Sequence, residues 1–143
     1  MAGGGGFRVV DGTLESFNDT SELGLLWNHK PTPADYTLRL EWRTFRADDN
    51  SGVFLRFPDP ESKGYNNPAW VAVHFGFEVQ IDELGQPDGA DIHKTGAIYN
   101  EPGQTLSIQA ARPPGQWNEF EIRVQGELHG AAQWRAGDAV RQR

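Results

Sequence analysis

The chain has 143 residues, 13 Lys and Arg against 20 Asp and Glu, a formal net charge of −7 and no cysteine. This length suits one domain that buries its own core, and the acidic balance argues against nucleic acid or an anionic membrane surface as a partner. Disulfides and thiolate metal sites are excluded, and no apolar run approaches the ~18 residues of a membrane-spanning helix.

The N-terminal part of the chain predicts little regular structure. Residues 1–6 hold four consecutive glycines and lack the basic and apolar regions of a signal peptide, so we expect a flexible lead. Residues 7–10 predict a short strand that ends in an Asp-Gly turn. Residues 13–23 are polar and rich in turn formers, and a short apolar run follows at 25–27.

Two strands with alternating apolar and polar residues come next. Residues 36–43 place Leu38, Leu40 and Trp42 on one face. After an Asp- and Asn-rich turn, residues 53–57 predict the second strand. Both patterns indicate strands with one face packed on a core.

The stretch over residues 74–82 also alternates and predicts a third strand. Its apolar face consists of Phe75, Phe77, Val79 and Ile81. Its other face aligns His74, Gly76, Glu78, Gln80 and Asp82. Two carboxylates, an amide and an imidazole at two-residue spacing are unusual for an ordinary solvated face. We therefore expect this face to be the floor of a polar groove, the alternative being an acid-rich edge strand.

The remainder of the chain continues the β pattern. A loop rich in Asp, Gly and Pro separates the third strand from residues 93–100, and further strands are predicted at 106–110 and 117–124. No window carries a convincing helical stripe, and no internal repeat or domain boundary is found. The expected class is all-β, a sandwich of two antiparallel sheets.

Five motifs in order resemble the 3-keto-disaccharide hydrolase domain family. They are L-R-L-E-W-R, N-S-G-V-F-L-R, G-F-E-V-Q-I-D, H-K-T-G-A-I-Y and G-Q-W-N-E-F-E-I. The resemblance covers residues 7–126 and implies a concanavalin A-like jelly-roll domain that acts on glycosides oxidised to a ketone at C3. Because many relatives are exported or lipid-anchored, it also implies a periplasmic or extracellular location.

In such a family the polar face of the curved sheet forms the substrate groove. The matching positions in this chain are Glu41, Arg43, Asn50, Arg56, Glu78, Gln80, Asp82, His93 and Tyr99. We expect Glu78, Asp82 and His93 to be catalytic and the others to bind a di- or oligosaccharide, with no cofactor required.

The chemistry of a 3-keto sugar indicates how such residues would act. The ketone acidifies the C2 proton, so that Glu78 or Asp82 as a base can remove it and an enolate can expel the group on C1. The other carboxyl group or His93 would then serve the leaving oxygen, and Arg56 would hold the enolate charge. Direct hydrolysis by paired carboxylates is the other route that the residues allow.

Several of these residues have simpler interpretations. Arg43 and Arg56 can form cross-strand ion pairs with acids such as Glu41. Asp82 opens a turn and can serve only that purpose. A lone His93 in a loop is more often a surface residue than a catalytic one, whereas His74 shares the predicted face of Glu78. A divalent metal held by Glu78, Asp82 and His93 is a further alternative.

Two non-catalytic functions are also considered. Jelly rolls host carbohydrate-binding modules as readily as hydrolases, so a binding module is the second hypothesis. Trp27, Trp70 and Trp117 could stack on sugar rings, although Trp42 and Trp117 fit core and turn packing better. A purely structural interaction domain leaves the polar face unexplained and is the weakest hypothesis.

The C-terminal tail, residues 127–143, departs from the family pattern. Relatives continue with a closing strand, whereas this segment is rich in Ala, Arg and Gly and has no alternating apolar run. Residues 131–136 favour at most a turn of helix. We therefore expect missing or altered C-terminal strands, an open sheet edge, and self-association of the chain through that edge.

Overall fold

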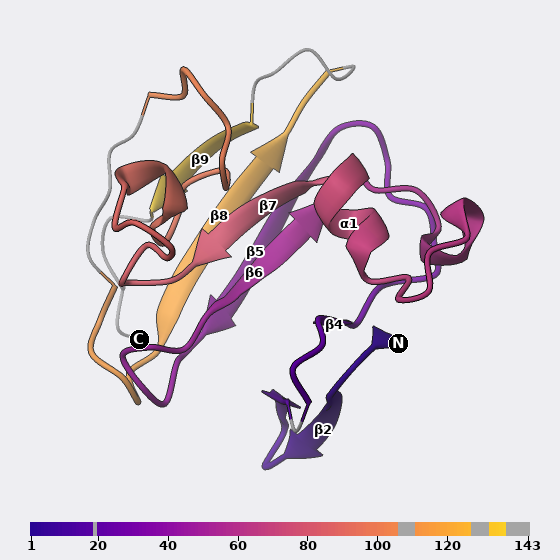
Figure 1. Cartoon of the computed structure of the whole chain (residues 1–143). Helices are drawn as coiled ribbons and strands as arrows, with labels where there is room; N and C mark the ends of the chain where they lie inside the picture. The colour runs from indigo at the N-terminus through magenta and orange to yellow at the C-terminus, as the bar shows by residue number, and fades with distance from the viewer. Residues whose placement is uncertain (19, 106–110, 127–131, 137–143) are drawn as a thin grey trace. The chain divides into compact units, whose positions relative to one another are not determined.

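The computed structural model describes residues 1–18, 20–105, 111–126 and 132–136, and the last segment is described as backbone alone. The chain is mostly β and forms two compact units, each treated separately below (Figure 1). Unit 1 consists of Met1–Pro31 and Phe54–Phe77, and unit 2 of Thr32–Val53 and Glu78–Arg143. The strand predicted at 106–110 lies outside the described residues.

Unit 1 begins with two small antiparallel pairs of strands. In the hairpin of β2 (Gly6–Val10) and β3 (Thr13–Phe17), Val10 pairs with Thr13. Asp11 and Gly12 have φ values of 49° and 76°, as a two-residue hairpin turn requires. The predicted strand and turn are therefore confirmed, whereas β3 was not predicted because its polar sequence resembles a loop.

The glycine-rich start differs from the expected flexible lead. Residues Ala2–Gly3 form β1, which pairs with β4 (Gly24–Leu25), and Ala2 is buried. Gly3 has a φ of 77°, and a side chain there would collide with the Leu23 carbonyl oxygen. The glycines thus allow two backbones to approach closely, which composition alone does not reveal.

A short helix in unit 1 corrects the strand predicted at 74–82. Helix α1 spans Trp70–Phe75 and follows the 3₁₀ helix η1 (Pro60–Lys63). At its start the Asn67 side chain accepts from the Ala69 N–H at 3.0 Å, and the Gly76 N–H bonds back to Ala72 at the end. Burial of Ala72 with Leu25 in an apolar cluster favours the helix over a strand. His74 therefore lies on α1 and not on the face of Glu78.

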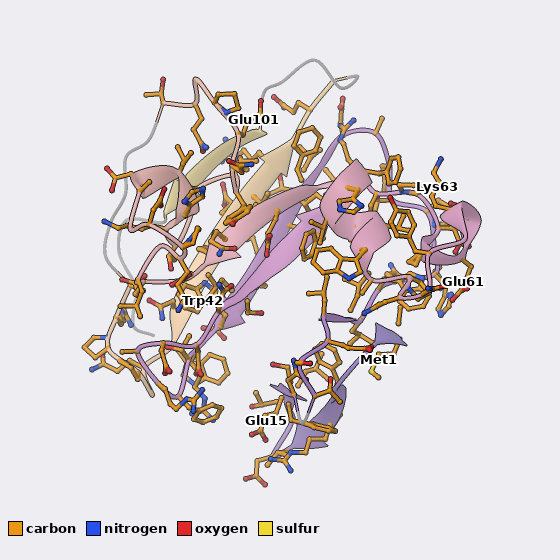
Figure 2. All side chains as sticks on the ribbon, in the orientation of Figure 1. Met1, Glu15, Trp42, Glu61, Lys63 and Glu101 are labelled. Atoms are coloured by element: carbon orange, nitrogen blue, oxygen red, sulfur yellow. The ribbon has the colours of Figure 1, made fainter. Side chains whose placement is uncertain are left out.

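Unit 2 contains the most extensive sheet. Its order is β5 (Tyr36–Trp42), β8 (Asn118–Val124) and β9 (Ala132–Ala136), all antiparallel, as Figure 1 shows. Leu40 pairs with Phe120, whose ring lies 5.2 Å from that of Trp42. Trp42, labelled in Figure 2, is buried, so the predicted core face of β5 is confirmed.

Strand β9 changes the expectation for the C-terminal tail. It pairs along β8 from Phe120 opposite Ala136 to Val124 opposite Ala132. The prediction of no closing strand, with at most a helical turn at 131–136, is wrong, because backbone pairing does not need an apolar alternation. The chain itself covers the edge on which self-association was predicted, and the oligomeric state stays a prediction.

One of two further strands carries Glu78 and Gln80, and Asn50, Arg56 and Asp82 directly flank these strands. Strand β6 (Ser51–Leu55) pairs with β7 (Phe77–Ile81), and Val79 of β7 forms an antiparallel bridge with Ile98. A short 3₁₀ helix, η2 (Asp91–His93), precedes that bridge. None of the helices in the described part of the chain has the length and apolar character to cross a membrane.

Candidate active site

Glu78 is the acidic residue of the candidate site whose pKa is raised by burial. It lies near the start of β7, and its carboxyl group lies against Gly52 of β6. A Cβ added to Gly52 would collide with the Glu78 side chain. Glycine at position 52 therefore makes room for the carboxyl group. Burial raises the pKa of Glu78 to about 7, because desolvation disfavours the charged form. A carboxyl group that titrates near neutral pH can both accept and return a proton.

Gln80 and Asn50 connect Glu78 to Asp82. The Gln80 amide donates to Asn50 Oδ1 at 3.3 Å, and Asn50 Nδ2 donates to Asp82 Oδ2 at 3.1 Å. With its oxygen and nitrogen exchanged, the Gln80 amide donates instead to Glu78 Oε1 at 3.1 Å and to the Ser51 carbonyl at 3.3 Å. The side chains at alternate positions of β7 therefore share one face, as the sequence predicts.

Asp82 holds the loop that follows β7. Its Oδ1 accepts from the N–H groups of Leu84 at 2.8 Å and Gly85 at 3.1 Å. Its Oδ2 accepts from the Gln86 N–H at 2.9 Å as well as from Asn50. These four donors occupy the acceptor positions of the carboxylate. The geometry matches the turn-forming interpretation of Asp82 and leaves little room for a further partner.

The polar face of β7 is less open than the alternation indicates. Gln80 and Asp82 are each only 1% exposed, so the expectation of an open groove floor is wrong at these two positions. Their polar groups are buried because Asn50 and the loop backbone supply hydrogen bonds that replace water. Glu78, by contrast, is only partly buried.

His93 forms a pair with an acid that sequence reasoning did not single out. His93 Nδ1 lies 2.7 Å from Asp88 Oδ1, and the ring is only 8% exposed. The Ala90 N–H and the His93 ring, in that order, hold the pKa of Asp88 below its ordinary value. Because an ionised Asp88 can only accept a hydrogen bond, we place a proton on His93 Nδ1. The other ring nitrogen, Nε2, is then available to exchange a proton with a substrate.

Tyr99 connects this pair to the position of Glu78. The Tyr99 N–H donates to the Glu78 carbonyl at 2.8 Å, next to the antiparallel bridge of Val79 with Ile98. Opposite residues of an antiparallel pair point to the same face, so Glu78 and Tyr99 share one. The Tyr99 ring lies 4.9 Å from the His93 ring. One carboxyl group, one phenol and one imidazole are thereby placed on neighbouring segments.

The remaining predicted residues lie elsewhere. Glu41 is exposed and pairs with Glu119 across β5 and β8, and the guanidinium of Arg43 lies 4.7 Å from the Trp117 ring. The alternative that Glu41 and Arg43 form cross-strand ion pairs finds no support among the described contacts. Arg56 belongs to unit 1 and has a φ of 56°. Its predicted approach to the enolate stays a prediction.

The alternative of a metal site does not fit the described side chains. Among the described residues, no three His, Asp or Glu side chains gather as a metal-binding group. The oxygens of Asp82 are occupied by four hydrogen-bond donors, and His93 Nδ1 is engaged by Asp88. Glu78, Asp82 and His93 therefore do not form a ligand set, and no step is derived through a metal.

Two residues of the candidate site, Gly52 and Asp88, were not predicted from the sequence. Gly52 stands in the N-S-G motif, where glycine also has the ordinary meaning of a turn. Asp88 precedes a glycine in a loop rich in turn formers, so its carboxylate gave no separate signal. The five-residue spacing from Asp88 to His93 becomes informative only once η2 is formed.

Comparisons with known proteins identify the family of the chain. Residues 1–135 match the family model described as 3-keto-alpha-glucoside-1,2-lyase-like domain. The chain therefore belongs to the family of 3-keto-alpha-glucoside-1,2-lyase-like domains, a family whose name denotes cleavage of glycosides. Searches with the chain gave no match among curated proteins or among solved structures.

Proposed function

We propose that this chain cleaves the glycosidic bond of 3-keto-glycosides by elimination between C1 and C2, with Glu78 as the base. The observation that carries the proposal is a partly buried carboxyl group whose pKa is raised to about 7 by burial in a family named for 1,2-lyases. A base with a pKa near the working pH is ionised in about half of the molecules and still binds a proton strongly.

The elimination begins with removal of the C2 proton and ends with hydration of the unsaturated sugar. Glu78 takes the C2 proton, and the electrons of that bond form an enolate with the C3 ketone. The enolate then forms a C1–C2 double bond as the C1–O bond breaks. Protonated His93, oriented through Nδ1 by Asp88, gives the Nε2 proton to the departing oxygen. The Glu78 proton exchanges with solvent before the hydration step. Water then adds its hydroxyl group to C1 and gives its other proton to His93 Nε2, and Glu78 delivers a proton to C2, which completes a net hydrolysis and restores both side chains.

The environment of the two carboxyl groups favours this route over direct hydrolysis. Hydrolysis by a carboxylate pair requires two acids that face the same bond. Asp82, the second predicted catalytic acid, directs both oxygens to backbone N–H groups and to Asn50. We therefore assign Asp82 to the loop and only Glu78 and His93 to catalysis.

The family resemblance supports two further proposals, one on the fold and one on the residues that contact the sugar. We propose a jelly-roll arrangement of sheets, supported by the antiparallel sheet of β5, β8 and β9. Glu41, Arg43 and Tyr99 of unit 2 would contact the sugar bound at Glu78. The guanidinium of Arg43 over Trp117 supports a role in sugar contact, since it holds an exposed aromatic ring in place.

Incubation with a 3-keto-disaccharide and with the same disaccharide unoxidised tests the function. We expect sugar release from the keto substrate alone, because only the ketone acidifies C2. Glu78→Gln should lower this turnover by roughly 10²–10⁴-fold while the fold is retained. Binding of either sugar without release would contradict the proposal and would favour the carbohydrate-binding module.

A further inference from the structure

The Gln80 amide lies between two sets of partners and can satisfy only one set at a time. In the first orientation its nitrogen donates to Asn50 Oδ1 at 3.3 Å, and its oxygen faces Glu78 and the Ser51 carbonyl. In the second orientation its nitrogen donates to Glu78 Oε1 at 3.1 Å and to the Ser51 carbonyl at 3.3 Å. In the first orientation the Gln80 oxygen therefore faces the acceptors of Glu78 and Ser51, and in the second it faces Asn50 Oδ1.

Asn50 cannot remove this conflict by turning its own amide. Its Nδ2 donates to Asp82 Oδ2 at 3.1 Å, and a carboxylate only accepts. Asp82 is itself fixed by three backbone N–H groups of the loop 84–86. The Asn50 oxygen is thereby held toward Gln80, and the conflict is left to Gln80 and Glu78.

The proton on Glu78 decides between the two orientations. When Glu78 is protonated, its O–H can donate to the Gln80 oxygen while the Gln80 nitrogen donates to Asn50, which gives two hydrogen bonds. When Glu78 is ionised, the turned amide donates to Glu78 and to the Ser51 carbonyl, again two hydrogen bonds. An ionised Glu78 against the unturned amide would face an oxygen at hydrogen-bonding distance, which is unfavourable.

We infer that Gln80 is a positioning residue whose amide turns over with the proton on Glu78 and so holds the carboxyl group in place in both protonation states. This inference rests on the proposed function, in which Glu78 accepts the C2 proton and later delivers a proton to C2. A base that serves both half-reactions needs a neighbour that can donate to the carboxylate and accept from the acid. Gln80 is 1% exposed, so water does not take over either task.

The groups that face Glu78 come from each neighbouring segment. Strand β6 contributes Gly52 and the Ser51 carbonyl, and β7 contributes Gln80. Tyr99 lies opposite Glu78 on the neighbouring segment, where its backbone N–H donates to the Glu78 carbonyl. Tyr99 is the only titratable side chain among these four. Burial is the cause of the raised pKa of Glu78. The Gln80 amide is the polar group in this set that can bond differently to the protonated and to the ionised carboxyl group.

The first test follows both side chains of the full-length chain by NMR as the pH is changed. The Glu78 carboxyl carbon and the Gln80 side-chain NH₂ are observed in the same titration. We expect the Gln80 signals to shift with the midpoint of Glu78, because the amide exchanges an Asn50 acceptor for a charged one. Gln80 signals that stay constant through that midpoint would overturn the inference without any need for a variant.

The second test replaces Gln80 by Met, which has a similar length but forms no comparable hydrogen bond. Gln80→Met removes a hydrogen bond from the ionised form of Glu78 and one from the protonated form. Because the bond to the charged form is the stronger, the Glu78 midpoint should rise by about one pH unit, together with the rising limb of the kcat/KM profile. Gln104→Met is the matched control. The Gln104 amide bonds Ile98 and Glu101 backbone groups, so its loss should lower stability and leave the Glu78 midpoint unchanged.

The outcomes separate this inference from the proposed function. A Glu78 midpoint that does not move in Gln80→Met, as in Gln104→Met, would reduce Gln80 to a structural residue. A chain that binds but never cleaves a 3-keto-glycoside would refute the proposed function, and the NMR titration would still decide whether the amide follows the proton.

Discussion

The raised pKa of Glu78 has a consequence for stability as well as for catalysis. Its folded value of about 7 lies above the ordinary value of 4.5, so the folded chain binds this proton more tightly than the unfolded chain. The contribution to stability is therefore fully present below pH 4.5 and is lost as the pH rises through 7. Above that pH, a charged and partly buried carboxylate destabilises the fold.

Replacing Glu78 by Gln should remove this pH dependence. We expect the free energy of unfolding at pH 8 to rise by about 2–3 kcal/mol, with little change at pH 4, while turnover is lost. Chemical denaturation of both proteins at the two pH values measures this. Equal stability at pH 8 would mean that water reaches the carboxylate and that burial does not raise its pKa.

Gly52 is expected to be sensitive to substitution because it accommodates the carboxyl group of Glu78. A Cβ at this position collides with the Glu78 carboxyl group, so Gly52→Ala must displace that side chain from β6. We expect turnover to fall by at least about tenfold, because misplaced catalytic groups lose rate steeply. Gly103→Ala is a contrasting control, since a Cβ there meets no atom within 4 Å. Because Gly103 has a φ of 77°, that control should cost some stability but no turnover.

The loop after β7 depends on Asp82 for its shape. Asp82→Ala removes the acceptor of three backbone N–H groups and of Asn50. We expect a loss of stability of about 3 kcal/mol or more, since unsatisfied buried donors each cost about 1–3 kcal/mol. A thermal melt against wild type measures it. A variant that melts like wild type but has lost turnover would return Asp82 to the catalytic role that the sequence suggested.

The pair of Asp88 and His93 makes a separate prediction. Asp88→Asn keeps the size of the side chain but removes the charge that fixes the Nδ1 proton on His93. We expect kcat to fall by roughly 10–100-fold with a smaller effect on KM, because the proton donor is misoriented while substrate contacts persist. Steady-state kinetics on a 3-keto-glycoside decide this. An unchanged kcat would mean that the charge of Asp88 is not needed to orient His93.

The strands with regular alternation were predictable, and the elements set by local backbone contacts were not. Strands β5 and β8 follow from their apolar positions, and the shared face of Glu78, Gln80 and Asp82 follows from their spacing. Alternation misled at His74, because a short amphipathic helix and a strand look alike over a few residues. The close approach of backbones at Gly3 and the pairing of β9 leave no periodic signal in the sequence.

The candidate site was predictable in part for the same reason. The carboxyl group of Glu78 was identified from its place in the strand, whereas the burial of Gln80 and Asp82 depends on Asn50, which lies 30 or more residues away in sequence. Long-range hydrogen bonds of this kind decide whether a polar face is an open groove or a buried network. Sequence alternation alone treats both cases alike.

Hydrogen exchange at C2 of the sugar tests the function of the whole molecule most directly. The full-length chain is incubated with a 3-keto-glycoside in D₂O, and the recovered substrate and the released sugar are examined by NMR. If Glu78 removes the C2 proton, deuterium appears at C2 with the wild-type chain and is roughly 10²–10⁴-fold slower with Glu78→Gln. Sugar released with its C2 proton fully retained would contradict elimination and would point to direct hydrolysis.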